Sequence, residues 1–319
     1  MSDLPRISIV TPSFNQGRYL EKTILSVLEQ DYPNLEYIII DGGSTDNSVE
    51  IIKKYEKQLT YWVSEKDRGQ SHAINKGFEH ATGEILSWLN SDDYYTPGAL
   101  LKAAELLQTN PAAGAIVGAG EFLVEDMGKI TLIEPFPVTL QSLYGAIDRY
   151  FMQPSCFFTH EVWKECGPLD EELHLAMDLD LWLNIANKYS FVTTEKNLSV
   201  SLVHGDAKTT AFAAQSYVDA AIVIMRHGGR KEGRERLVGF VDGYLSMSKE
   251  LTKLTDESTH KNNELIDAYE ENTALRQLLA EKQQQIDEIY SSFSWKLTAP
   301  LRKICSLILS TSGKFNSQH

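Results

Sequence analysis

Two adjacent carboxylates, Asp92 and Asp93, directly follow the short apolar run of residues 85–89. Neighbouring negative charges are costly to bring together unless a cation balances them. Carboxylate oxygens suit Mg²⁺ or Mn²⁺, and such an ion can bridge carboxylates to a diphosphate. The pair therefore indicates a metal and phosphate site. With Ser91, the same residues would also serve as an N-terminal cap for a helix that starts near Pro97.

The elements that would position this pair can be traced along the first hundred residues. Strand-like β-branched runs occupy residues 7–10, 37–40, 61–63 and 85–89, and helical patterns between them include residues 48–55 and 71–80. Such alternation predicts an α/β fold with a parallel sheet and right-handed crossovers. Ligands of these sheets bind beyond the carboxyl ends of the strands, where this sequence carries polar and glycine-rich segments.

Five blocks of sequence make this interpretation more specific. They are residues 10–15 (VTPSFN) with 19–30; 38–46 (IIIDGGSTD); 67–70 with 73–77 and 81–84; 88–93 (WLNSDD); and 153–155 with 167–170 and 177–183, followed by His204, Lys208 and Thr209. In order and spacing, these blocks resemble glycosyltransferase family 2 from residue 7 to about residue 210. A series of five is far more specific than any single block.

The resemblance implies a GT-A fold, Rossmann-like with a mostly parallel sheet, that binds a nucleoside-diphosphate sugar. By the same resemblance, Thr11, Pro12 and Asp41 line the pocket for the base and ribose, and Phe14 stacks near the base. Arg68 would meet the diphosphate, for which its planar guanidinium is well shaped. A surface ion pair is the alternative role for Arg68.

The resemblance also implies the reacting groups. Asp93 is expected to be the main ligand of Mn²⁺ or Mg²⁺, Asp92 to contact the ribose or the metal, and His204 to contact the metal or a phosphate. Asp178 is expected to deprotonate the acceptor hydroxyl. A bound divalent ion neutralises the leaving diphosphate, and a base on the opposite face of the sugar gives inversion. An ordinary surface histidine and an ordinary polar helix position are the alternatives for His204 and Asp178.

The predicted activity is inverting transfer from a nucleoside-diphosphate sugar, with UDP the commonest carrier, to a glycan or lipid-linked acceptor in bacterial surface polysaccharide synthesis. The formal net charge of −14 argues against a nucleic-acid partner. A nucleotidyltransferase would need a basic, glycine-rich loop near the N-terminus, and residues 11–18 do not form one. A degenerate transferase domain acting as an oligomeric scaffold is the non-enzyme alternative, against which the intact Asp93 and Asp178 speak.

Compartment and membrane signals are sparse. Three widely spaced cysteines without a CxxC pair suggest neither a zinc site nor a disulfide framework, and they fit a reducing compartment. The N-terminus lacks the pattern of a signal peptide, and no apolar run approaches the ~18 residues of a spanning helix. We therefore expect a cytoplasmic protein.

The composition changes after the resemblance ends, which predicts a catalytic domain over residues 1–235 and a helical segment over residues 236–291. A heptad laid down from Leu251 has apolar residues at nine of its thirteen a and d positions, with Asn272 as a polar a residue. This pattern predicts a coiled coil and a homo-oligomer formed through it. A long helix packed on its own catalytic domain is an equally weighted alternative.

Residues 292–319 contain basic residues and no acid, with Trp295 just before a short amphipathic pattern that begins at Pro300. A basic amphipathic helix with an aromatic anchor suits an anionic membrane surface. We therefore predict a peripheral contact with the inner face of the plasma membrane. A frayed or domain-packed terminus is the alternative.

Overall fold

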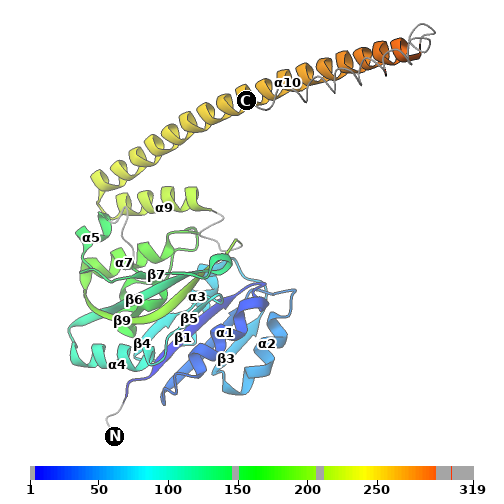
Figure 1. Ribbon diagram of the computed structural model, residues 1–319. Helices are drawn as coiled ribbons and strands as arrows, with labels where there is room; N and C mark the ends of the chain where they lie inside the picture. Colours follow the sequence, from blue (N-terminus) through cyan, green and yellow to red (C-terminus); the bar gives the residue numbers. More distant parts are fainter. Residues whose placement is uncertain (1–3, 146–150, 206–211, 292–302, 304–319) are drawn as a thin grey trace, which may run out of the picture. The chain divides into compact units, whose positions relative to one another are not determined.

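The computed structural model describes residues 4–145, 151–205, 212–291 and 303 (Figure 1). The chain divides into two compact units, residues 1–242 and residues 243–319. The first unit contains the sheet and every predicted site residue. The predicted tail, residues 292–319, lies outside the described residues except for Lys303, and so do Lys208 and Thr209.

The first third of the chain alternates strands and helices. The strands are β1 (Ile7–Ser13), β2 (Leu35–Asp41), β3 (Tyr61–Ser64) and β4 (Ile85–Trp88); between them lie α1 (Gly17–Leu28), α2 (Ser48–Tyr55), the 3-10 turn η1 (Glu56–Gln58) and α3 (Gln70–Glu79). β1 pairs in parallel with β2 and β4, and β2 pairs in parallel with β3. Their carboxyl ends therefore share one edge, as the alternating pattern predicts.

The second part of the domain extends the same sheet with strands of both directions. Its elements are β5 (Asp93–Tyr95), α4 (Ala99–Thr109), β6 (Ala113–Val124), η2 (Glu125–Met127), β7 (Lys129–Ile133), α5 (Leu140–Tyr144), η3 (Gln153–Ser155), β8 (Cys156–Thr159), α6 (His160–Cys166), α7 (Met177–Lys188) and β9 (Ser190–Val203). The strand order is β3-β2-β1-β4-β8-β6-β9-β5, with β7 paired to β6. β8 is antiparallel to β4 and β6, and β5 is antiparallel to β9, whereas β6 and β9 are parallel. The α/β prediction is confirmed, with a sheet that is mixed in this second part.

Two apolar cores lie on opposite faces of the sheet because side chains alternate along each strand. Ile7 and Ile9 of β1 pack with residues of α1 and α4, whereas Val10 packs with residues of α3 and α7. Trp88 and Trp182, 1% and 3% exposed, stack in the second core with ring centroids 5.4 Å apart. Both tryptophans are core residues rather than sugar platforms.

Two helices follow the sheet. α9 (Ala213–Arg226) packs on α7 and buries Val223 and Ile224 in the same core. Its end is fixed where the His227 side chain hydrogen-bonds the Asp180 carboxylate, with 2.8 Å between Nε2 and Oδ1. α10 (Arg230–Ser291) then runs as one continuous helix through the whole predicted helical segment. The helical C-terminal extension is confirmed.

One local expectation is wrong. Asp92 and Asp93 do not cap a helix: α4 begins at Ala99 behind Gly98, whose φ of 76° suits glycine. Asp93 instead opens strand β5. Among the described residues, none of the helices combines the length and apolar character required to cross a bilayer.

Candidate active site

The loops that follow β1 and β2 are tied together at the carboxyl edge of the sheet. Asn15, in a left-handed conformation with φ of 52°, accepts a hydrogen bond from the backbone N–H of Thr45 through its side chain, at 2.8 Å. The N–H of Gly17, at the start of α1, donates to Asp46 at 2.9 Å. A Cβ on Gly17 would lie 2.0 Å from a side-chain oxygen of Asn47, so a larger residue would displace the Asn47 side chain. Hydrogen bonds therefore join the two loops into one side of the candidate site.

Asp41 holds the second of these loops in shape. Its carboxylate accepts hydrogen bonds from the N–H groups of Gly43 and Ser44, and from the hydroxyls of Ser44 and Ser64, at 2.5–3.1 Å. The side chain is fully buried. Hydrogen-bond donors of the protein thus surround the Asp41 carboxylate, which the sequence predicts in the base pocket. A nucleotide base would have to contact this carboxylate in addition to these donors.

The other predicted donor residues lie on β1 and just beyond it. Thr11 and Pro12 are buried, and the Thr11 hydroxyl lies 3.1 Å from the hydroxyl of Tyr37. Phe14 is 59% exposed, which is unusual for an aromatic side chain in a tied loop. An exposed ring at this edge is available to a flat ligand.

The two adjacent acids occupy different environments. Asp93 is 5% exposed, and its carboxylate accepts hydrogen bonds from Asn90, Ser201 and the backbone of Leu202. Burial, followed by the negative charge of Asp92, raises the pKa of Asp93 well above its usual range. A bound cation would remove that conflict, since it would favour two ionised carboxylates side by side.

Asp92 meets His204 in space. Asp92 Oδ2 lies 3.2 Å from His204 Nε2, although the two residues are 112 positions apart. The His204 side chain is 2% exposed, that of Asp92 is 19% exposed, and the buried His204 Nδ1 has no hydrogen-bond partner within the described residues. A buried imidazole with an unused nitrogen beside a carboxylate is not an ordinary surface histidine. The structure therefore brings together Asp92 and His204, two of the three predicted metal ligands, and buries the third, Asp93.

Two residues that the sequence prediction gave no role support His204. The Tyr19 ring packs on the imidazole with centroids 4.5 Å apart, and its hydroxyl donates to Glu125 at 3.0 Å. Glu125 comes from η2, at the turn between β6 and β7, and also accepts from Arg18 at 2.6 Å. Tyr19 belongs to the block of residues 19–30 that resembles the family. Its contact with Glu125, more than a hundred residues away, is visible only in the folded structure.

A chain of amides fixes the loop that precedes Asp93. Asn90 accepts from Gln70 at 2.8 Å and donates to both Asp93 and Gln153 at 3.1 Å. Gln153 in turn donates to the backbone carbonyl of Trp88 at 2.9 Å. Asn90 therefore works as a junction between α3, η3 and the acidic pair, a role that an aspartate without N–H donors could not fill.

In this structure Arg68 forms a surface ion pair, the alternative to the predicted contact with a diphosphate. Its guanidinium makes two hydrogen bonds to the Glu171 carboxylate, at 2.8 and 3.0 Å, with the Arg68 side chain 67% exposed. An exposed ion pair of this kind is worth at most about 1 kcal/mol. A diphosphate could compete for the guanidinium, so the pairing does not conflict with the predicted contact.

Asp178 lies in the first turn of α7, half-buried. Burial and, next, the negative charge of Asp178 raise the pKa of the Cys156 thiol. Cys156 begins β8 immediately after η3, and η3 carries the Gln153 side chain that contacts Asn90. The charge of Asp178 therefore acts on the start of β8, which follows the segment that supports the acidic pair.

No group of three or more His, Cys, Asp or Glu side chains suited to a metal ion occurs within the described ranges. The donor set nevertheless fits a hard divalent ion. Mg²⁺ and similar ions in nucleotide enzymes take one or two carboxylates, while substrate phosphates and water complete the coordination. Asp92 supplies a partly exposed carboxylate of this kind, and the His204 imidazole lies beside it.

The comparisons identify the class as a glycosyltransferase. Residues 8–161 match the family model described as glycosyl transferase family 2. An uncharacterized glycosyltransferase of Mycobacterium tuberculosis is 31% identical over 188 residues, covering 58% of this chain and 71% of the relative. TuaG of Bacillus subtilis, whose name assigns it to teichuronic acid biosynthesis, is 36% identical over 117 residues, covering 36% of this chain and 46% of TuaG. The chain belongs to glycosyltransferase family 2.

A solved structure supports the fold. The mannosyltransferase PcManGT from Pyrobaculum calidifontis, in complex with GDP-Man and Mn²⁺, has a TM-score of 0.56 to this chain at 20% identity, covering 78% of this chain and 81% of PcManGT. The GT-A fold predicted from the sequence is thereby confirmed. The chain spans only 66% and 35% of the lengths of two further curated relatives, so it corresponds to part of those proteins.

Proposed function

We propose that this protein is a metal-dependent, inverting glycosyltransferase that moves a sugar from a nucleoside-diphosphate sugar to a hydroxyl of a glycan or lipid-linked acceptor. The observation that carries the proposal is the contact between Asp92 and His204 at the carboxyl edge of the sheet, next in sequence to the buried Asp93. The fold neighbour PcManGT, solved with GDP-Man and Mn²⁺, supports both the donor class and the ion.

Asp92 and His204 would hold the ion through a carboxylate oxygen and an imidazole nitrogen, of which the carboxylate suits Mn²⁺ or Mg²⁺. When bound, the ion supplies charge neutralisation for the departing diphosphate. Asp93 remains the ligand that the family resemblance predicts. In the present arrangement its carboxylate instead accepts bonds from Asn90 and Ser201, which hold the loop and keep Asp92 in place. Single substitutions of the two acids separate these roles.

Asp178 is proposed as the base. A carboxylate removes the acceptor proton only if it remains ionised near neutral pH and reaches the hydroxyl. Its oxygen Oδ1 accepts the N–H of Leu179 at 2.8 Å, which fixes the side chain at the helix N-terminus, where a negative charge is favoured. Removal of a proton by a residue opposite the leaving group gives inversion at the sugar carbon.

The similarity to TuaG supports a bacterial surface polymer as the acceptor class. Contact of residues 292–319 with an anionic membrane is a further part of the proposal, and it rests on the sequence alone. Such a contact would bring a lipid-linked acceptor to the enzyme.

Titration calorimetry tests the metal site directly. UDP, GDP and dTDP are titrated with and without Mn²⁺, and we expect at least one to bind more tightly with the ion. Asp92→Asn and His204→Ala should abolish the gain due to Mn²⁺, whereas Asp93→Asn should abolish it only if this carboxylate is a ligand. His80→Ala removes an exposed histidine that stacks on Tyr61 and serves as the control. If no nucleotide responds to Mn²⁺, the metal assignment is refuted and the scaffold alternative gains support.

The base assignment needs a transfer assay. After a panel of nucleotide sugars has identified the donor, Asp178→Asn should bind it with unchanged affinity but lose transfer by about 10²–10⁴-fold, the usual contribution of general base catalysis. Substantial residual transfer in this variant would place the base elsewhere. Determination of the anomeric configuration of the product then distinguishes inversion from retention.

A further inference from the structure

The long helix α10 carries an apolar stripe that no side chain covers within the part of the chain that the structure describes. Every described side chain of α10 from Gly243 onward is exposed. Six large apolar residues at a and d positions are 44–74% exposed: Leu251, Leu254, Leu265, Leu275, Leu279 and Ile286. Polar residues interrupt the row at Ser258, Lys261, Asn272 and Lys282. Exposed apolar residues that recur at this spacing mark a surface for interaction with another helix.

The same heptad phase continues backward into the first unit. Counting back from Leu251 places Tyr244 and Leu237 at a positions and Met247 and Phe240 at d positions. Phe240 stacks on Tyr217 of α9, with ring centroids 5.4 Å apart. The stripe thus begins as a packed interface in the catalytic domain and continues along the helix where its residues are exposed. A helix that only covered its own catalytic domain would not need apolar residues at heptad spacing beyond its contact with α9.

We propose that two copies of this chain associate through α10 as a parallel, in-register coiled coil from about Leu251 to Ile289. In this arrangement each a or d residue meets the same residue of the second copy. The helix rises about 1.5 Å per residue, so the paired segment would be roughly 55–60 Å long. Both catalytic domains would then be attached to the same end of the coil, and both C-terminal tails would leave the other end.

The flanking charges select the parallel orientation. The g positions carry a row of acids, Glu250, Glu257, Glu264 and Glu271, and the e positions carry Thr255, Asn262, Tyr269 and Arg276. A parallel pair places each g residue beside an e residue of the second copy, which opposes glutamate to neutral residues or to an arginine. An antiparallel pair would place g beside g and oppose glutamate to glutamate. That repulsion acts against the antiparallel form.

Asn272 selects the register and the number of chains. It is a polar residue at an a position, with its side-chain oxygen accepting a hydrogen bond from Arg276 at 3.1 Å. Burying one amide against an apolar residue is costly, whereas two amides opposite each other can pair. A single buried asparagine at an a position is the known device for fixing a two-stranded register.

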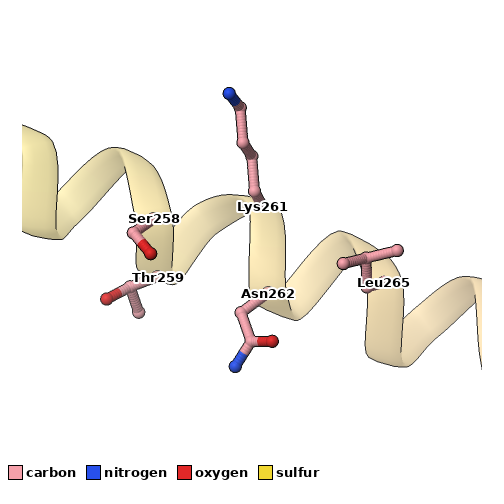
Figure 2. A pocket seen from close by; sticks show the side chains of 5 residues that line it. All are labelled: Ser258, Thr259, Lys261, Asn262 and Leu265. Atoms are coloured by element: carbon pink, nitrogen blue, oxygen red, sulfur yellow. The ribbon is translucent and has the colours of Figure 1, made fainter.

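A hollow on α10 has the layout that such packing needs. It is lined by Ser258, Lys261, Asn262 and Leu265, the a, d, e and following a positions, together with Thr259 (Figure 2). Knobs of a facing helix insert into holes formed by four residues of this kind. In the in-register pair the knob is Lys261 of the second copy. Leu265 offers apolar surface for its long stem, while its ammonium group reaches solvent.

Light scattering after size-exclusion chromatography tests the stoichiometry. The full chain at micromolar concentration should have twice the mass of one 35.9 kDa chain. Leu265→Glu places a charge at an a position and should reduce the mass to that of one chain. Ile266→Glu, at the adjacent b position and 50% exposed, is the matched control and should leave the dimer intact. A monomeric or trimeric full chain, or equal effects of the two substitutions, would overturn the proposal.

Cysteine cross-linking tests the orientation in a Cys305→Ser background, since Cys156 and Cys166 are buried. Leu251→Cys alone and Ile286→Cys alone should each form disulfide-linked dimers on mild oxidation, because identical a positions face each other. A mixture of the two variants should give few mixed dimers. Predominantly mixed dimers would show an antiparallel coil and contradict the proposal. Circular dichroism of each variant confirms that the helix persists, and none of these readouts depends on the sugar donor.

Discussion

Thr23 links α1 to the acidic loop, and its removal should weaken both the fold and the proposed metal site. The hydroxyl lies 2.9 Å from the carbonyl oxygen of Ser91 and 2.7 Å from that of Asp93, and the residue is 1% exposed. Thr23→Val keeps the shape but leaves two buried carbonyls without this donor. A lost donor in a buried site costs about 1–3 kcal/mol. In a unit of this size 2 kcal/mol lowers the melting temperature by about 4–8 °C.

Intrinsic tryptophan fluorescence in a Trp295→Phe background is the appropriate assay, because the remaining Trp62, Trp88, Trp163 and Trp182 all lie in the first unit. Far-ultraviolet circular dichroism would mix in the signal of α10. Thr23→Ser retains the hydroxyl and should stay close to the wild type. The Val variant should also show weaker nucleotide binding in Mn²⁺ while binding without the ion is unchanged. The linking role would be refuted if Thr23→Val had the melting temperature of the wild type, or if Thr23→Ser had the same lowered melting temperature as Thr23→Val.

Two further predictions concern the opposite end of the sheet and the C-terminus. Burial raises the pKa of Glu36, but hydrogen bonds from Ser8 and Thr82 and the charge of Arg6 outweigh it and lower the pKa below the ordinary 4.5. The folded carboxyl therefore binds protons less readily than the unfolded one. Its stabilising contribution is complete above pH 4.5 and is lost as the pH falls through the folded pKa. Urea unfolding between pH 3 and 7 should show that Glu36→Gln loses less free energy of unfolding in acid than the wild type does. If the free energy of unfolding depends on pH equally in both proteins, Glu36 does not have a lowered pKa in the folded state. Deletion of residues 292–319 should release the protein from anionic phosphatidylglycerol vesicles in a sedimentation assay without changing its fluorescence melting curve, and an intact chain that ignores such vesicles would disprove the membrane contact.

The elements could be predicted from sequence because their signals are local. Buried parallel strands form continuous apolar runs, and α1 buries Leu20, Ile24 and Val27 at helical spacing. The spacing of apolar residues alone therefore predicts the strands and this helix. The mixed second part of the sheet was harder to predict, because β6 and β9 pair across nearly eighty residues and their register contains irregularities. Residue types cannot specify which distant strands become neighbours.

The candidate site likewise combines residues that local sequence predicts with contacts that only the fold creates. The acidic pair, Asp41 and His204 could be named from blocks of sequence, because each stands at the end of an apolar run or in a recognisable motif. What each side chain touches depends on contacts between distant segments. Glu125 supports the site from a turn that carries no motif, and Arg68 pairs with Glu171 across more than a hundred residues. Such partners are chosen by the fold, after the local elements have formed.

The different environments of Asp92 and Asp93 follow from the geometry of a strand. Successive side chains of a strand point to opposite sides, and Asp93 is the first residue of β5, paired with Ser201 of β9. Its carboxylate is therefore directed inward, toward Asn90 and Ser201, while that of Asp92 stays near the surface beside His204. His204 reaches this position because β9 ends at Val203, one residue earlier. Two adjacent acids at a strand end thus give one partly exposed carboxylate and one buried carboxylate, and the comparison of Asp92→Asn with Asp93→Asn tests which of them the proposed metal site needs.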